Sequence, residues 1–326
     1  MSHSLPVVAI VTPFLADANN GNWRTAHRWA SLLQERYKTI VQNAWPLRPP
    51  RPVEALIALH ARRSAASARR FREEHPESPL IVALTGTDLY ADLAHSTETQ
   101  DALAMADALV VLQDAAISHI PLQYRHKTHV IYQSARRLLP ARKNKERLDC
   151  VVVGHLRHEK DPETIFRLAE LIPADSPVHI LHIGAVLDEQ FALRAKLLTA
   201  TNPHYHWTGS LAHGLTRAAI KRAHLLIHPS IMEGGANVIV EAVTAGTPVI
   251  ASRIPGNVGM LGNDYPGYFP VGDAAALWSL LSKCTREGSF LLRLNTACRA
   301  RATMFLPETE RASLCQMVDS LILRAA

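Results

Sequence analysis

The sequence predicts an α/β protein with two doubly wound domains, each built around a parallel sheet. Short apolar runs alternate with amphipathic segments along both halves of the chain, which is the pattern of strand–helix units. The apolar runs are continuous, as in strands that are buried on both faces of a parallel sheet. The chain has 326 residues, of which 48% are hydrophobic, so each half is long enough and apolar enough to bury a core.

The first half is expected to contain five strands and two long helices. A loop rich in Asp, Asn and Gly, residues 13–21, joins the first strand to the first helix. The expected strands are 6–12, 53–59, 80–84, 107–112 and 129–131, and the expected helices are 22–37 and 64–74.

The pattern of the first half breaks at residues 134–148, SARRLLPARKNKERL, which hold a proline and six basic residues. Such a charge run is typical of a solvated linker, so we place the domain boundary here. The first domain is predicted to span residues 1–140 and the second 148–305. The C-terminal helix, 306–326, is expected to pack back on the first domain.

The second half repeats the alternation with clearer helix ends. Asp161 and Pro162 supply an N-cap and a first-turn proline, and Asp273 caps a later helix. Gly246 stands where a helix commonly ends in a left-handed residue. The expected strands are 150–153, 179–183, 204–207, 224–228, 248–251 and 268–271, and the expected helices begin at 162, 188, 214, 237, 274 and 287, the last being divided at residues 306–307.

Charge and composition narrow the class of partner. Lys and Arg number 35 against 29 Asp and Glu, which gives a formal charge of +6 and favours an anionic substrate, an acidic membrane surface or nucleic acid. Aromatic residues make up only 6% and do not interleave with basic ones, so nucleic acid is the least favoured. We expect no nucleic-acid partner.

The location of the protein is predicted from its cysteines and apolar runs. The four cysteines lie far apart without metal-like spacing, as in a reducing compartment. The run 6–12 is too short for a signal sequence, and no stretch approaches the ~20 apolar residues of a membrane-spanning helix. We therefore expect a cytoplasmic protein without stable membrane association.

The stretch 224–252 carries the main chemical motif. Gly234 and Gly235 follow a buried strand and allow the backbone to approach a ligand, while the next helix offers N–H groups to an anion. Glu233 and Glu241 bracket this site and can accept hydrogen bonds from sugar hydroxyls. Two glutamates eight residues apart also occur by chance on solvated faces, but the strand–loop–helix–strand context favours a sugar-nucleotide site.

This whole pattern resembles the donor-binding unit of the GT-B glycosyltransferases of family 4, which include sucrose and polysaccharide synthases. The resemblance implies two Rossmann-like domains facing across a cleft. It also implies that Glu241 accepts the ribose hydroxyls and Glu233 the hexose hydroxyls, with Gly235, Ala236 and Asn237 meeting the sugar or distal phosphate through backbone N–H groups.

The leaving diphosphate needs positive charge, which the loop after residue 153 offers. In the family this loop reads Gly-Arg-x-x-x-x-Lys-Gly, and Lys160 falls on the family lysine. His155 stands where the arginine is usual. Arg157 is a possible substitute, because a guanidinium binds phosphate in a bidentate manner, or else a surface charge. No Asp-x-Asp occurs, so we expect neither a metal nor another cofactor.

Three strand ends of the first domain gather groups that suit a small oxyanion acceptor such as phosphate or selenophosphate. His60 is predicted to orient the acceptor, with a structural cap as the alternative, and Asp88 to orient its own loop. Arg62 and Arg63 also begin a basic helix, so we expect at least one of them to be functional. The other predicted acceptor residues are Gly21, Asn22, Thr25, Thr85, Gly86 and Thr87.

A more specific resemblance extends over nearly the whole chain. GNWRTAHRWA, ALHARRSA, ALTGTDLY, GHLRHEKDP and HPSIMEGGANVIVEA together are similar to the selenosugar synthases, the glycosyltransferases of bacterial selenoneine biosynthesis. The resemblance implies that selenophosphate attacks the anomeric carbon of a UDP-hexose, UDP-N-acetylglucosamine or UDP-glucose. UDP then leaves, and loss of phosphate gives a selenosugar. The residues by themselves support a sugar nucleotide with a small anionic acceptor.

Two features depart from the broad family. Thr85 stands where a histidine often precedes Gly-x-Asp, and residues 254–257 replace the usual Gly-Gly-x-x-Glu. Both disfavour an ordinary sugar acceptor. Two alternatives stay open: a hexosyltransferase acting on a glycan or lipid, which would need an exposed basic–apolar helix, and a sugar-nucleotide sensor without turnover.

Overall fold

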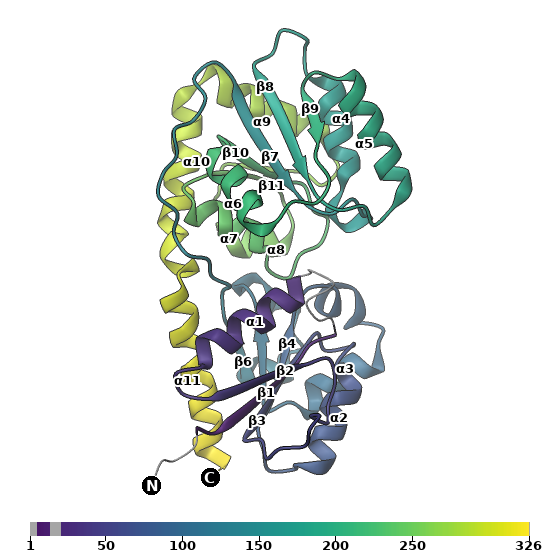
Figure 1. Cartoon of the computed structure of the whole chain (residues 1–326), viewed down its shortest axis with the longest axis vertical. Helices are drawn as coiled ribbons and strands as arrows, with labels where there is room; N and C mark the ends of the chain where they lie inside the picture. Colours follow the sequence, from purple (N-terminus) through teal and green to yellow (C-terminus); the bar gives the residue numbers. More distant parts are fainter. Residues whose placement is uncertain (1–4, 14–20, 326) are drawn as a thin grey trace. The chain divides into compact units, whose positions relative to one another are not determined.

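The computed structural model describes residues 5–13 and 21–325, and it divides the chain into two compact α/β units (Figure 1). Unit 1 comprises residues 1–133 and 307–326, and unit 2 comprises residues 134–306. Each unit contains a six-stranded sheet in which all pairs of neighbouring strands are parallel. The predicted fold class, α/β with two doubly wound parallel sheets, is confirmed.

The sheet of unit 1 has the strand order β2-β1-β3-β4-β5-β6. Its strands are β1 (Val7–Val11), β2 (Lys38–Gln42), β3 (Ala55–Leu59), β4 (Leu80–Leu84), β5 (Ala108–Val111) and β6 (Thr128–Val130). Its α-helices are α1 (Gly21–Leu33), α2 (Ala65–Glu74), α3 (Thr97–Met105) and α11 (Pro307–Ala325), with the short turns η2 (Asp88–Asp92), η3 (Asp114–His119) and η4 (Leu122–Lys127).

Helices cover both faces of this sheet. Alternate residues of β1 face opposite sides: Ile10 packs in a core with Trp29 of α1 and residues of α11, whereas Ala9 packs in a core with Phe71 of α2 and Leu103 of α3. A strand that is buried on both sides carries apolar residues at every position, which explains the continuous runs in the sequence.

The C-terminal helix α11 is held in unit 1 by polar contacts as well as apolar ones. The buried carboxylate of Glu310 accepts hydrogen bonds from Trp29 Nε1 (2.8 Å) and Arg28 Nε (2.8 Å). Further along α11, Asp319 accepts a hydrogen bond from the Tyr37 hydroxyl (2.5 Å). The chain thus leaves unit 1 after Gln133 and returns to it after Leu306.

The sheet of unit 2 has the order β12-β11-β10-β7-β8-β9. Its strands are β7 (Leu148–Val153), β8 (Val178–Ile183), β9 (Tyr205–Trp207), β10 (Leu225–His228), β11 (Val249–Ser252) and β12 (Tyr268–Phe269). Its helices are α4 (Pro162–Leu171), α5 (Glu189–Thr201), α6 (His213–Arg222), α7 (Asn237–Thr244), α8 (Pro255–Leu261), α9 (Ala274–Arg286) and α10 (Gly288–Arg301), with the turns η5 (His158–Lys160) and η6 (Ala302–Phe305).

The predicted helix ends of unit 2 are confirmed. Asp161 caps α4 by accepting a hydrogen bond from the backbone N–H of Thr164 (3.1 Å), and Asp273 caps α9 through the N–H of Ala276 (2.8 Å). Gly246 follows α7 with φ of 73°, the left-handed conformation that the pattern required.

Residues 134–140 were predicted to belong to the first domain, and this is wrong. They belong to unit 2, because the backbone N–H of Ala135 bonds to Phe305 O (3.1 Å) and that of Leu138 to Thr244 O (3.2 Å). These contacts join segments far apart in the sequence, which a local charge pattern cannot reveal.

The sequence pattern missed β2, α3 and α8, and it placed the end of α1 too late. β2 is a partly exposed edge strand that pairs only with β1, so its apolar signal is weak. α8 is seven residues long and contains two glycines, which lower helix propensity. Residues 14–20 of the predicted loop 13–21 lie outside the described residues.

Candidate functional site

Two loops of unit 2 meet at the carboxyl edge of its sheet. One follows β7 and contains η5, and the other follows β10 and leads into α7. The backbone N–H of Ile231 donates to the carbonyl of Glu159 (3.0 Å), which ties the two loops together. Lys160 forms an ion pair and hydrogen bond with Glu233 Oε1, so the predicted phosphate lysine and hexose glutamate are in direct contact.

His228, the last residue of β10, completes this group. Its Nε2 lies 3.2 Å from Glu233 Oε1, and its side chain is only 2% exposed. We call Lys160, His228 and Glu233 the unit 2 cluster. The sequence analysis did not select His228, although its position at the end of a buried strand and directly before Pro229 was a usable signal.

The electrostatics of the cluster keep Glu233 ionised. Burial of the carboxyl group raises the pKa of Glu233, but the nearby Lys160 ammonium and then the His228 ring outweigh burial and hold this pKa well below its ordinary value. Burial lowers the pKa of His228, against the opposing effect of Glu233. The cluster therefore brings an ionised carboxylate into contact with the Lys160 amine and with an imidazole whose pKa lies below its ordinary value.

Glycines allow the surrounding backbones to approach closely. A Cβ on Gly184 would lie 1.8 Å from the carbonyl oxygen of Gly154, so the loops after β7 and β8 could not pack this way with any larger residue at 184. A Cβ on Gly256, in the first turn of α8, would lie 2.1 Å from the carbonyl oxygen of Glu233. Gly256 thereby lets α8 lie directly against the glutamate's backbone.

The other predicted donor residues occupy the same edge. Glu241 lies within α7, is largely buried and is 2.7 Å from His213 Nε2 at the start of α6. His155 uses Nδ1 to accept a hydrogen bond from the backbone N–H of Ala185 (3.0 Å), which holds its loop against the one after β8. Gly234, Gly235, Ala236 and Asn237 form the turn into α7, with Ala236 as its N-terminal cap residue.

Arg157 lies on the exposed side of this loop. Its Nε is 3.7 Å from Glu159 Oε2, and both side chains are more than a third exposed. An exposed pair at this distance contributes little to stability. Of the two cations that the sequence singled out, Lys160 is therefore the one that the fold brings to Glu233.

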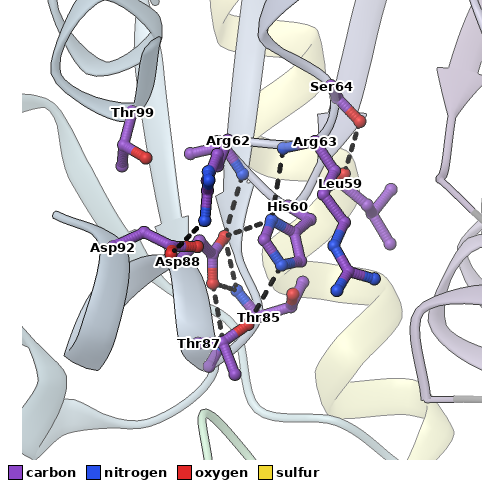
Figure 2. A network of polar contacts seen from close by, with 12 residues as sticks. Leu59, His60, Arg62, Arg63, Ser64, Thr85, Thr87, Asp88, Asp92 and Thr99 are labelled. Carbon is purple, nitrogen blue, oxygen red and sulfur yellow. Dashed lines mark hydrogen bonds and ion pairs between the residues drawn. The ribbon is translucent and has the colours of Figure 1, made fainter. Parts of the chain in front are cut away.

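In unit 1, the ends of β3 and β4 form a second polar network (Figure 2). Asp88 is fully buried, and its carboxylate accepts backbone N–H groups from Ala61 (2.9 Å), Thr85 (2.9 Å) and Gly86 (2.8 Å). Since Ala61 follows β3 and the other two follow β4, this carboxylate pins the two loops to each other. The predicted orienting role of Asp88 thus has a geometric basis.

His60 lies between the same two loops. It is 3% exposed, has a positive φ of 70°, and places Nε2 3.0 Å from Thr87 Oγ1. Positive φ is uncommon and costly for a residue with a side chain, and such positions cluster at functional sites. The side chain thus faces Thr87, a hydroxyl that we predicted to bind the acceptor.

The remaining predicted acceptor residues fall into two groups. Arg62 and Arg63 are exposed at the start of the α2 turn, and Arg62 forms an ion pair with Asp92 (2.9 Å). Gly21 and Asn22 begin α1 and are accessible. Thr25, by contrast, is buried: its hydroxyl donates to Gly21 O (2.9 Å) and accepts from Gln133 Nε2 (2.7 Å), which holds the helix start.

Over the described ranges 5–13 and 21–325, no group of three His, Cys, Asp or Glu side chains could hold a metal ion. In the same ranges, no helix is long and apolar enough to cross a membrane. The four cysteines are buried and free, and burial raises the pKa of the Cys150 thiol.

Comparison with solved structures defines the class of fold. Sucrose-phosphate synthase from Thermosynechococcus elongatus matches over 98% of this chain and 100% of its own, with a TM-score of 0.79 and 15% identity. HepE from Anabaena, solved in complex with UDP, matches over 97% of this chain and 100% of its own (TM-score 0.73, 14% identity). A glycosyltransferase from Rickettsia africae matches over 98% of this chain and 99% of its own (TM-score 0.72, 14% identity). The chain therefore has the GT-B fold.

A comparison with protein families matches part of the chain. Residues 139–297 match the family described as Glycosyl transferases group 1, and this range lies wholly within unit 2. The unit 2 cluster lies at the carboxyl edge of the sheet in this matched range.

Proposed function

We propose that this protein is a glycosyltransferase that moves a hexosyl group from a UDP-sugar, foremost UDP-N-acetylglucosamine, to selenophosphate. The observation that carries the proposal is the contact of Lys160 and His228 with Glu233 at the carboxyl edge of the sheet in the range that matches group 1 glycosyl transferases. The selenium acceptor rests on the sequence resemblance to selenosugar synthases.

The donor half of the site would work by complementary charge. Departure of UDP places negative charge on the distal phosphate, and Lys160 supplies the neutralising ammonium. Glu233, kept ionised, accepts hydrogen bonds from the hexose hydroxyls, and Glu241 accepts those of the ribose. The crystal structures of HepE with UDP and with UDP-glucose favour a uridine donor for a chain of this fold.

The acceptor half would lie at the ends of β3 and β4. Selenium attacks the anomeric carbon with its own electron pair, the bond between that carbon and the diphosphate oxygen breaks, and its electron pair leaves with UDP. Arg62, Arg63 and the threonines of the β4 loop offer hydrogen-bond donors to the phosphate oxygens of the acceptor.

The test is UDP release from UDP-N-acetylglucosamine with and without selenophosphate, in the presence of a chelator, followed by mass spectrometry of the product. We expect selenophosphate-dependent UDP release and a hexose carrying the selenium isotope pattern. UDP-glucose serves as the second donor. UDP release that is indifferent to selenophosphate would refute the acceptor assignment, and glycan and lipid acceptors would then be tried.

A further inference from the structure

The net charge of the chain is concentrated in one short segment. Residues 134–148, which we call the basic segment, hold six of the 35 basic residues but only one of the 29 acidic ones, so they carry +5 of the net +6. Helix α6 lies against this segment and adds three basic residues and no acidic one. The rest of the chain holds 26 basic and 28 acidic residues, so it has no positive excess.

Most cations of the basic segment have no carboxylate partner. Four arginines in or beside α2, by contrast, form ion pairs: Arg62 with Asp92, Arg69 with Asp101, Arg70 with Glu74 and Arg72 with Asp107. In the basic segment Arg147 pairs with Asp149 (2.7 Å). Four other cations are exposed and lie beyond ion-pair distance of any carboxylate in the described ranges 5–13 and 21–325: Arg136, Arg137, Arg142 and Lys145. Their charges are available to an external anion.

The backbone of the basic segment is fixed on unit 2, although residues 134–147 form no helix or strand. Figure 1 shows them as an extended trace along the side of this unit. Four contacts hold the trace: Leu138 N with Thr244 O (3.2 Å), Arg136 O with Arg217 Nη2 (2.9 Å), Lys143 Nζ with Ala223 O, and Asn144 O with His224 Nε2 (2.9 Å). The exposed cations are therefore presented to solvent from a fixed support.

Leu139 lies among these cations with its side chain in solvent. It is 82% exposed, the highest value of any large hydrophobic residue in the part of the chain that the structure describes. Arg136 and Arg137 precede it, and Arg142 follows it. A single exposed leucine is ordinary, but one flanked on both sides by unpaired cations suits a membrane surface, where apolar side chains enter and cations meet the headgroups.

From this arrangement we infer that the basic segment docks unit 2 on an anionic lipid surface, with its arginines on the headgroup phosphates and Leu139 inserted among them. A cluster of four to eight cations is sufficient for binding to anionic lipid, at about fivefold in affinity for each cation. One inserted leucine adds little area, so the contact is reversible and differs from stable membrane association. No helix in the described ranges can cross a membrane, so the contact is peripheral.

Two other kinds of polyanion match these residues less well. Nucleic-acid phosphates would attract the cations, but the basic segment has no aromatic residue to stack on a base, and a phosphate backbone offers no apolar region to Leu139. A specific interface with an acidic protein is built around several apolar or aromatic residues, whereas Leu139 is the one large hydrophobic side chain that this segment exposes.

The test is co-sedimentation of the full chain with vesicles of phosphatidylcholine, either pure or mixed with phosphatidylserine. No UDP-sugar is present, so the inference does not rest on the proposed function. We expect binding to the vesicles that contain phosphatidylserine and none to pure phosphatidylcholine. Binding should fall steeply as salt is added, because the interaction between exposed charges is screened.

Charge reversal within the basic segment tests the surface itself. The double variant Arg136→Glu/Arg137→Glu should bind at least about thirtyfold more weakly, the effect of losing two cations at a lipid surface. Its matched control is Arg48→Glu/Arg51→Glu, which makes the same change in net charge at two exposed arginines of the loop between β2 and β3. The control should bind within about threefold of wild type.

Leu139→Ser tests the insertion, and we expect it to bind about tenfold more weakly at unchanged net charge. Circular dichroism should give the wild-type spectrum for every variant, because all the substituted positions are exposed.

Three results would overturn the inference. Equal weakening by the two double variants would show that total charge, and not the basic segment, governs binding. Wild-type binding by Leu139→Ser would remove the insertion. Absence of phosphatidylserine-dependent binding, with duplex DNA or polyglutamate bound instead and released by Arg136→Glu/Arg137→Glu, would assign the segment to nucleic acid or to an acidic protein; absence of binding to all three probes would refute docking altogether.

Discussion

The carbonyl oxygen of Glu233 fills the space that a side chain on Gly256 would need. A Cβ at residue 256 would lie 2.1 Å from that oxygen and 3.0 Å from Glu233 Cβ, closer than heavy atoms can approach. The first turn of α8 therefore packs directly against the backbone of the loop that carries Glu233 and fixes its position. The Pro255-Gly256-Asn257 segment, which departs from the broad family pattern, is part of the site's support.

Gly256→Ala should displace Glu233 and reduce kcat/KM for the UDP-sugar by about tenfold to a hundredfold, because small misplacements of catalytic groups have effects of this size. The measurement is initial rates of UDP release at varied donor concentration. Gly214→Ala in α6 is the matched control, since a Cβ there meets nothing within 4 Å. Equal effects of the two substitutions would show that Gly256 does not support Glu233.

Lys160→Met should abolish UDP release and also destabilise the protein. It removes the cation that neutralises the leaving diphosphate, and it leaves the buried Glu233 carboxylate without its closest partner, a loss of about 3 kcal/mol in the free energy of unfolding. Glu233→Ala should abolish transfer as well. Urea unfolding and UDP release together test this, with Lys196→Met on α5 as the control. Wild-type turnover in Lys160→Met or in Glu233→Ala would refute the assignment of these residues to the UDP-sugar site.

His182 predicts a loss of stability in mild acid. Burial lowers the pKa of His182 to about 4, while its ring bonds to the Tyr205 hydroxyl (2.9 Å) and Gly154 O (3.3 Å). In the unfolded chain His182 takes up a proton below about pH 6.5, whereas in the folded chain it does so only near pH 4. The neutral buried ring therefore contributes stability that is fully present above pH 6.5 and is lost as the pH falls from about 6.5 to about 4. The loss is on the order of 3 kcal/mol.

We expect His182→Gln to be less stable than wild type at pH 7 but to change less between pH 6.5 and 4.5, as measured by urea unfolding at each pH. His206→Gln is the matched control, because His206 lies on the neighbouring strand β9 with an exposed side chain. A variant that loses stability as steeply as wild type over this interval would show that another group causes the acid sensitivity.

Glu310→Ala should weaken the attachment of α11 within unit 1. The substitution leaves the Trp29 indole N–H and the Arg28 guanidinium without their buried carboxylate, a cost of about 3–5 kcal/mol. Thermal unfolding followed by circular dichroism should show a lower transition temperature, whereas Glu308→Ala, at an exposed position two residues earlier in α11, should change it little. Equal transition temperatures would mean that the helix is held by its apolar face alone.

Local chemistry explains why much of the fold could be predicted from the sequence. β4 was predicted to its ends, because a continuous apolar run bounded by Pro79 and Thr85 has few other interpretations. Asp161, Asp273 and Gly246 marked helix ends through interactions with their immediate neighbours. β2 was missed, because an edge strand that is only half buried leaves little apolar pattern.

The residues of the candidate site also divide into those that the sequence could identify and those that only the structure brings together. By itself, the sequence determined that Lys160 and Glu233 belong to loops after buried parallel strands, because strand, glycine and helix signals are local. Only the tertiary structure decided that His228 joins them, that Gly256 supports Glu233, and that His60 meets Thr87 across two loops. Those contacts depend on strand order and register, which bring together residues that no local pattern relates.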